Sequence, residues 1–402
     1  MARNARIVTD APGRPPYNPR AACAAPGKDM GDIRVLALYP GFHPEANEMA
    51  IVWQQACALG GLRVLALAPA LDLFKGARSA QQRLDAGALS VRWLDDQQHP
   101  LRVTEDVLAQ ARQFAPDIVF VATRGNLPAG RALAQALDAT LVVHTEFFFT
   151  DAMLVNRREY LGVPALIPLA AARARRALRN GPAVVYVSDP PERARFGGER
   201  TLQYLPWPHP APPAGSEAVA QDARDVDRFV YIGSLSRMKG ARRLGTYLCH
   251  AAQTMPDLKM LLIGPPMDPE GRAVLTMLQQ RLGARLDYRT HVPREEAMRL
   301  IARTFMVFSP GDFMGWGQIG DAWWRGTPVV ACRPHYDLVH DSNCLVVASA
   351  ADFAQTVSRL RADVTLRARL AQGGLETVAR HAVPAVAHGL HASLTALMRP
   401  PG

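Results

Sequence analysis

Strand-like and helix-like segments alternate along most of the chain, and this alternation limits the possible fold more than any other feature. The first unit is a strand over Ile33 to Tyr39, a turn at Pro40-Gly41, a helix over about 45 to 59 and a strand over 62 to 68. Two strands joined by a helix in this way form a βαβ unit. Repetition of such units predicts an α/β fold with helices on both faces of a parallel sheet.

The same pattern continues to about residue 208. Asp117 to Thr123 is an apolar run bounded by Pro116 and Gly125, as is typical of a strand buried on both faces. Strands are also predicted at Thr140 to His144 and Ala183 to Ser188, and a long Ala/Arg helix at about 166 to 178.

The chain has 402 residues, more than one hydrophobic core usually serves, so we expect two domains. Between 209 and 226, Pro, Ala, Gly, Ser and Asp dominate without periodicity, which is typical of a linker. The predicted division is a disordered tail at 1–32, a first α/β domain at 33–208, a linker at 209–226, a second α/β domain at 227–382, and a C-terminal helix at 383–402 that can return to the first domain.

Composition excludes several classes of protein. The cysteines are odd in number and form no Cys-x-x-Cys pair, so neither a disulfide framework nor a zinc site is expected; they are Cys23, Cys57, Cys249, Cys332 and Cys344. No apolar run is long enough to span a bilayer, and the first 32 residues lack the apolar core of a secretory signal. We therefore expect a cytoplasmic protein, and Met30 is a candidate start.

The charge balance is basic. Lys and Arg number 46 against 36 Asp and Glu, which gives a net charge of +10. Such an excess fits ordinary solubility, and it equally fits an anionic partner such as a nucleotide diphosphate, a membrane surface or a nucleic acid.

A loop in the second half has the features of a phosphate site. A strand ends at Gly233, a polar stretch beginning with Ser234 follows and includes Arg237, and Lys239-Gly240 opens a helix. Open α/β sheets bind ligands at the carboxyl ends of their strands, and helix N-termini favour phosphate. A solvated basic turn would explain the same residues.

A second segment, at about 309 to 330, contains glycines that allow a close approach between backbone and ligand. Gly315, Gly317 and Gly320 precede Asp321, which lies one turn inside the next helix. A carboxylate there can accept hydrogen bonds from ribose hydroxyls, or it can simply stabilise the helix N-terminus.

Together these segments resemble the C-terminal domain of GT-B-fold retaining glycosyltransferases of the glycogen-synthase-like and sucrose-synthase-like superfamily. The resemblance covers about Phe229 to Val347. The matching stretches, in chain order, are Gly233 to Gly240, Gly264-Pro265-Pro266, Asp312 with Gly315-Trp316-Gly317, Asp321-Ala322, Gly326 to Val330 and Val339 to Val347.

The first half is similar to the family more loosely. His144 closes a strand where relatives carry a histidine that contributes to sugar binding, and Gly41 occupies the first glycine-rich turn. The chain also departs from the family. Ser234 replaces an arginine that helps the lysine to hold the diphosphate, and Asp312 and Asp321 replace two glutamates with eight residues between them instead of seven.

The resemblance implies two Rossmann-like doubly wound domains facing each other across a cleft, and transfer of a sugar from a nucleotide-sugar with retention. Lys239, Arg237 and His144 are the implied catalytic residues, without a metal or another cofactor; no Asp-x-Asp motif is present. The implied donor-binding residues are Gly41, Gly233, Ser234, Gly264, Gly315, Gly317, Gln318, Ile319 and Asp321.

The sequence leaves two kinds of acceptor possible. Arginines concentrated between 157 and 195, including Arg157, Arg158, Arg173 and Arg176, form either a solvated helix face or an anionic acceptor surface. The acceptor is a lipid-linked or polysaccharide glycan, with peripheral membrane contact, or a hydroxylated base in DNA, as for phage DNA glucosyltransferases of the same fold. The alternatives are a non-catalytic nucleotide-sugar-binding protein and a nucleotide-sugar epimerase.

Overall fold

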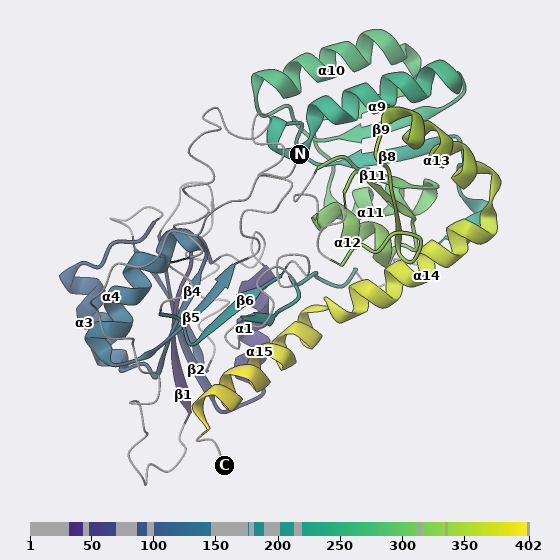
Figure 1. The fold of residues 1–402 in the computed structure, drawn as a ribbon. Helices are drawn as coiled ribbons and strands as arrows, with labels where there is room; N and C mark the ends of the chain where they lie inside the picture. Colours follow the sequence, from purple (N-terminus) through teal and green to yellow (C-terminus); the bar gives the residue numbers. More distant parts are fainter. Residues whose placement is uncertain are drawn as a thin grey trace, which may run out of the picture.

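The computed structural model describes residues 32–42, 48–69, 87–94, 100–145, 176, 181–188, 202–212, 219–311, 316–333 and 337–399. These residues form two α/β domains, each built on a parallel sheet (Figure 1). Both sheets are parallel at every pair of neighbouring strands. The predicted fold class is therefore confirmed.

The first sheet has seven strands in the order β3-β2-β1-β4-β5-β6-β7. The strands are β1 (Ile33–Leu38), β2 (Leu62–Pro69), β3 (Leu89–Leu94), β4 (Ile118–Ala122), β5 (Thr140–Thr145), β6 (Val184–Val187) and β7 (Leu202–Tyr204). The described helices of this domain include α1 (Glu48–Ala58), α3 (Glu105–Phe114) and α4 (Leu127–Leu137).

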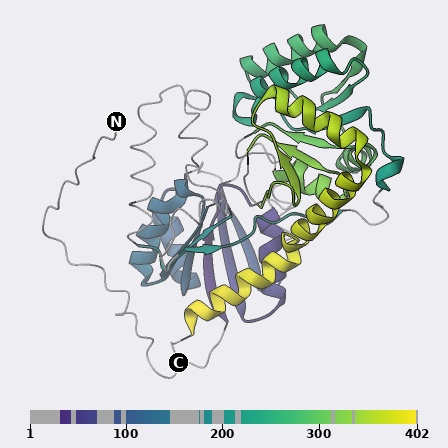
Figure 2. The same cartoon turned by 45° about the vertical axis from the view of Figure 1, so that its right-hand side comes forward.

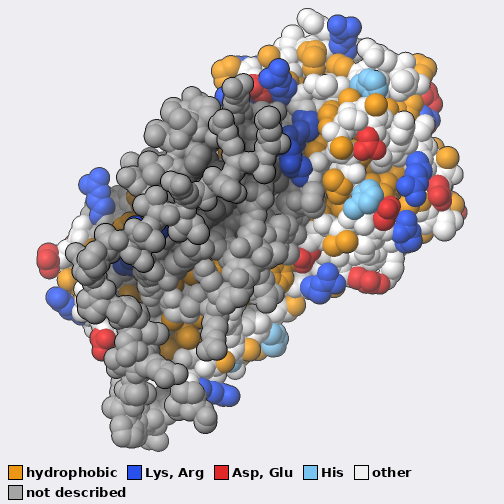
Figure 3. Space-filling view, viewed as in Figure 1, with side chains coloured by type: hydrophobic (Ala, Val, Ile, Leu, Met, Phe, Trp, Pro, Cys, Tyr) orange, Lys and Arg blue, Asp and Glu red, His pale blue; other side chains and the backbone are white. Residues whose placement is uncertain are grey.

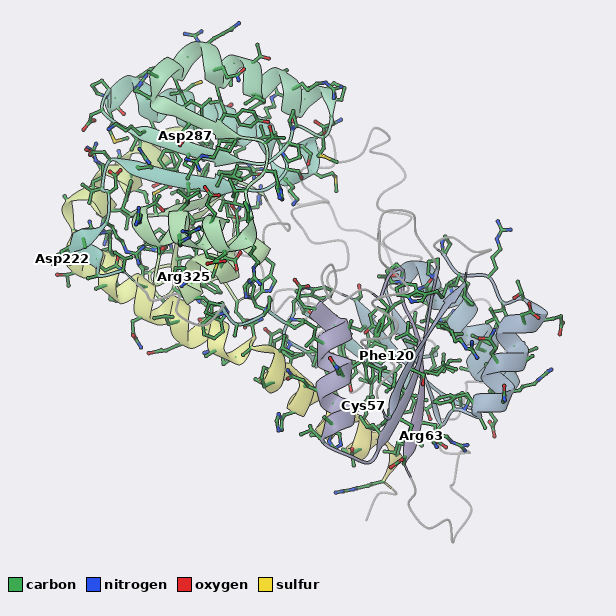
Figure 4. All side chains as sticks on the ribbon, turned by 180° about the vertical axis from the view of Figure 1, so that it is seen from behind. Cys57, Arg63, Phe120, Asp222, Asp287 and Arg325 are labelled. Carbon is green, nitrogen blue, oxygen red and sulfur yellow. The ribbon has the colours of Figure 1, made fainter. Side chains whose placement is uncertain are left out.

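Helices cover both faces of this sheet. On one face, Trp53 of α1 meets Phe120 of β4 edge to face, with ring centroids 5.0 Å apart. Phe120 accordingly lies in the middle of the domain, between the sheet and α1 (Figure 4). On the other face, Leu133 of α4 and Val107 of α3 belong to a second apolar cluster. Burial on both faces explains why β4 reads as a continuous apolar run.

The second sheet has six strands in the order β10-β9-β8-β11-β12-β13. The strands are β8 (Arg228–Ile232), β9 (Lys259–Ile263), β10 (Leu286–Arg289), β11 (Val307–Ser309), β12 (Val329–Ala331) and β13 (Cys344–Val346). The described helices of this domain are α9 (Ala241–Thr254), α10 (Pro269–Leu282), α11 (Arg294–Arg303), α12 (Trp316–Trp324), α13 (Ala350–Ala362) and α14 (Val364–Arg380). Its described 3-10 turns are η3 (Gln221–Ala223), η4 (Arg237–Lys239) and η5 (Gly283–Arg285).

Strand β3 and helix α3 are absent from the elements predicted by the sequence pattern. In α3, Thr104 caps the helix by accepting a hydrogen bond from the backbone of Val107, and Ala115 ends it in the left-handed region. This start signal is visible in the sequence. The helix expected at 166 to 178 lies outside the described residues, apart from Arg176, which is helical.

Helix α15 (Val383–Met398) continues from α14 and runs from the second domain to the first (Figure 2). It packs beside α1, where Val386, Leu390 and Leu394 join the core of the first domain. Within the described part of the chain, no helix is both long and apolar enough to cross a membrane.

The chain passes between the domains twice, at 205–209 and at 381–383, and the two passages are bonded to each other. The backbone N–H of His209 donates to the carbonyl of His381, at 2.8 Å. The buried His381 ring lies 2.8 Å from the Trp207 carbonyl through Nδ1 and 2.8 Å from an Asp337 oxygen through Nε2. Tyr204 donates to the same oxygen at 2.6 Å. We call Tyr204, Asp337 and His381 the crossing network.

Candidate functional site

Strand order locates one candidate site in each sheet. In the second sheet the chain runs from β8 to β9 and β10 on one side and from β11 to β12 and β13 on the other. The strand order therefore reverses between β8 and β11. In the first sheet β1 lies between β2 and β4 in the same way. Ligands of open parallel sheets bind outside the carboxyl ends of the strands at such switch points. The segment after β8 is the predicted phosphate loop, and Gly41 follows β1.

The segment from Gly233 to Gly240, here called the β8 loop, folds back over the end of its own strand. Ser236 accepts a hydrogen bond from the backbone N–H of Lys239 and thereby caps η4. The Cδ of Lys239 lies 3.9 Å from the position that a Cβ on Gly233 would occupy, so the lysine stem covers this glycine. Gly240 has φ of +76°, and a Cβ there would be 2.7 Å from the Pro310 carbonyl oxygen. The end of the β8 loop therefore packs closely against the segment that follows β11.

The turn after β9 supports the β8 loop from the other side. Gly264 has φ of +138°, and a Cβ there would lie 2.2 Å from the Gly233 carbonyl oxygen. The Leu235 backbone donates to the Pro265 carbonyl at 2.9 Å and accepts from Met267 at 2.8 Å. Contact at this distance requires glycine at 264.

Asp268 is a further support that the resemblance did not single out. Its carboxylate caps α10 by accepting from the Gly271 N–H at 2.7 Å and also accepts from the Arg237 N–H at 2.8 Å. One side chain thus joins the start of α10 to the β8 loop. An Asp directly before Pro-Glu is a recognisable helix start, but the bond to Arg237 spans 31 residues and has no local signature.

The first turn of α12 also lies at the end of β8. Gln318 accepts a hydrogen bond from the backbone N–H of Ile232, the last residue of β8, at 3.0 Å. Ile319 is fully buried, whereas a Cβ on Gly317 would meet nothing within 4 Å. The structure thus brings Lys239, Gly233 and the N-terminus of α12 together at the end of β8. Gly315 and Asp312 lie outside the described residues.

Asp321 is engaged by other side chains. It forms an ion pair with Arg294 at the start of α11 (2.8 Å), and His209 Nε2 lies 3.5 Å from the same oxygen. The His209 ring packs on Gly320, where a Cβ would lie 2.1 Å from the ring. Burial lowers the pKa of His209, although the Asp321 charge opposes this effect. Neither Arg294 nor His209 was predicted, because both meet Asp321 only through the tertiary fold.

His144 lies inside the first domain, with 2% of its surface exposed. Its Nε2 is 3.0 Å from the Ser188 hydroxyl, which itself donates to the Leu205 carbonyl at 2.7 Å. The imidazole N–H must therefore donate to the serine. Burial lowers the pKa of His144 to about 3, so the ring is neutral. The structure does not bring His144 to the β8 loop through any described contact.

Of the remaining candidates, Gly41 and Arg176 are among the described residues. Gly41 is buried directly after Pro40. Arg157, Arg158 and Arg173 lie outside the described residues, and Arg176 is exposed. Among the residues with described positions, no cluster of three or more His, Cys, Asp or Glu side chains is arranged to hold a metal ion.

Comparison with known proteins gave one curated relative. No family model matches the chain. The glycosyltransferase LpsD of lipopolysaccharide core biosynthesis from Rhizobium meliloti is 30% identical over 176 residues, which is 42% of this chain and 49% of LpsD. The chain therefore matches about half the length of this relative.

Solved structures match nearly the whole chain. Anabaena HepE, solved with UDP and glucose, has a TM-score of 0.66 at 14% identity, over 90% of this chain and 99% of HepE. Sucrose-phosphate synthase from Thermosynechococcus elongatus has a TM-score of 0.69 at 17% identity, over 91% of this chain and 99% of that one. With its two parallel-sheet domains, the chain has the GT-B fold that these proteins share.

Proposed function

We propose that the chain is a glycosyltransferase that takes a sugar from a nucleotide-sugar donor, with retention and without a metal ion. The observation that carries this proposal is the convergence of the β8 loop and the N-terminus of α12 at the switch point of the second sheet. Lys239 and the backbone N–H groups of a helix start are suited to a diphosphate there. The likeness of the fold to a protein solved with UDP and glucose supports a nucleotide-sugar ligand.

The chemistry follows from the charge that develops on the leaving group. When the sugar departs, negative charge accumulates on the nucleotide diphosphate. Lys239, Arg237 and the first N–H groups of α12 would stabilise it, and groups that are already fixed in place pay no cost of reorganisation. Asp268 and Gly264 hold the β8 loop in position for this task.

For the acceptor we favour a lipid-linked or polysaccharide glycan. The curated relative acts in lipopolysaccharide core biosynthesis, which supports a saccharide acceptor. On the face shown in Figure 3, basic and acidic side chains of the described residues are interspersed. A DNA acceptor would instead call for a basic stripe along the phosphates, with steep loss of binding as salt rises.

The first test is a ligand screen. UDP, GDP, ADP and CMP and their sugars are added to the protein, and the unfolding midpoint and nucleotide release are measured. Stabilisation by one nucleotide together with release from its sugar supports the proposal. Stabilisation without release in the presence of glycan acceptors favours the non-catalytic binding protein, and appearance of an epimer favours the epimerase. No stabilisation by any nucleotide would contradict the proposal.

The second test is Lys239→Ala, which we expect to lower kcat by ~10²–10³, the usual cost of one preorganised charge-stabilising group. The matched control is Lys259→Ala, because Lys259 is exposed at the amino end of β9, the opposite edge of the same sheet. Steady-state nucleotide release from the donor identified in the screen measures both. Equal kcat in the two variants would remove Lys239 from the mechanism.

A further inference from the structure

Thr123, which neither motif nor resemblance singled out, has an unusual backbone. It follows β4 directly and has φ of +73°. A β-branched residue rarely adopts this region, and such strain persists only where the surrounding structure enforces it. Among the described residues, the other non-glycine residues with positive φ are Ala115 and Asp138, which end helices, and Asp341. Thr123 ends no helix.

The strain is fixed by the sheet. The N–H of Thr123 donates to the carbonyl of His144 at 3.0 Å, and Ala122 pairs with His144 in the register of β4 and β5. On its other side β4 pairs with β1, which leads to Gly41. Thr123 therefore lies at the switch point of the first sheet, where ligands of open α/β sheets bind.

The hydroxyl of Thr123 is also unsatisfied. Its oxygen is shielded from solvent and has no hydrogen-bond partner among the described residues. A buried polar atom without a partner costs free energy, so each one requires an explanation. Ser309 also has such a hydroxyl, but it is 0% exposed and has no positive φ. Thr123 as a residue is partly exposed, whereas Ser309 is fully buried.

We infer that Thr123 is a substrate-contacting residue whose hydroxyl binds a sugar hydroxyl at the switch point of the first sheet. This inference rests on the proposed function. A threonine hydroxyl both donates and accepts, as a sugar hydroxyl does, whereas a phosphate only accepts. The sugar belongs either to the donor or to the acceptor, and the experiment below distinguishes these sources.

The decisive variant is Thr123→Val, which keeps the shape and the strained backbone but removes the hydroxyl. The matched control is Thr140→Val at the amino end of β5, the opposite edge of the sheet. Affinities are measured for the nucleotide-sugar that wild type binds best, for its free nucleotide, and for methyl glycosides of glucose, galactose and mannose. Unfolding midpoints are recorded for every variant.

If Thr123 contacts the donor sugar, Thr123→Val binds the nucleotide-sugar roughly three- to tenfold more weakly and the free nucleotide equally well. If it contacts the acceptor, donor affinity is unchanged and transfer to methyl glycosides falls by a similar factor relative to hydrolysis. In either case Thr123→Ser retains most of the affinity, and Thr123→Gly, which relieves the strain, raises the unfolding midpoint while weakening binding.

Two results would overturn the inference. One is a Thr123→Val protein that matches wild type in every affinity and rate. The other is a Thr123→Val protein with a clearly lower midpoint, because the hydroxyl would then have an internal partner. A wild-type protein that binds no nucleotide or nucleotide-sugar is a different failure, since it removes the proposed function itself.

Discussion

At the scale of single residues, burial decides what a polar side chain can do. His144 ends a strand at the edge where ligands are expected, yet its ring is neutral and hydrogen-bonded inside the domain. Thr123, one strand away, combines a positive φ with a hydroxyl that has no hydrogen-bond partner in the described part of the chain. A sequence pattern can indicate one edge of a sheet without indicating which side chains there are already hydrogen-bonded inside the domain.

The neutral state of His144 makes stability depend on pH. In the unfolded chain a histidine has a pKa of about 6.5, whereas burial lowers the pKa of His144 to about 3 in the folded protein. Between these values only the unfolded chain takes up the proton, so the free energy of unfolding falls as pH drops from about 6.5 toward 3, by at most about 1.4 kcal/mol per pH unit.

We expect His144→Gln to reduce this fall in the free energy of unfolding at acid pH, because an amide can still donate to Ser188 but does not titrate. The control is His388→Gln on the exposed face of α15, which should keep the wild-type profile. Urea unfolding at a series of pH values measures both. An unchanged slope in His144→Gln would show that this histidine is not the cause.

At the scale of elements, the order of strands and helices was predictable from the sequence. The contacts between side chains far apart in the sequence were not. Apolar runs predicted β1 and β4 to within one residue at each end, because buried parallel strands have this composition. The edge strand β3 was missed, because its apolar residues alternate with Ser90 and Arg92 and do not form a continuous apolar run. The partners Arg237 and Asp268, or Asp321 and Arg294, are far apart in sequence and come together only by packing.

The contact between the turn after β9 and the β8 loop can be tested with glycine substitutions. Gly264→Ala places a Cβ 2.2 Å from a carbonyl oxygen, so we expect a loss of about 1–3 kcal/mol in stability, as is typical of overpacking, and weaker nucleotide binding. Gly283→Ala is the control, because φ is also positive there (+53°) but a Cβ meets nothing within 4 Å. Denaturant unfolding and nucleotide affinity compare the two. Similar losses in both would mean that backbone conformation alone requires glycine at 264.

At the scale of the whole molecule, the crossing network ties the two domains where the chain passes between them. Burial alone would raise the pKa of Asp337, but hydrogen bonds from His381 and Tyr204 outweigh this effect and lower it. The carboxylate is therefore charged, and it receives bonds from the last strand of the first domain and from the joint between α14 and α15.

Tyr204→Phe removes one of these bonds. A hydrogen bond to a charged group contributes about 1.5–3 kcal/mol, and we expect a loss of this size together with a broader unfolding transition as the domains become less coupled. Tyr186→Phe is the control, because it removes a neutral hydrogen bond to Ser393 within the first domain. Calorimetry shows whether one transition separates into two. Equal cooperativity in both variants would mean that the network does not couple the domains.

Helix α15 has a consequence for how the protein is made. The first domain is encoded first, but one wall of its core is supplied by Val386, Leu390 and Leu394, close to the end of the described chain. During synthesis on the ribosome, the apolar side of α1 stays uncovered until these last residues have emerged from the exit tunnel. We therefore expect the early-made half to depend on the late-made half for completion, so that a nascent chain stalled before 383 presents an unfinished first domain to chaperones.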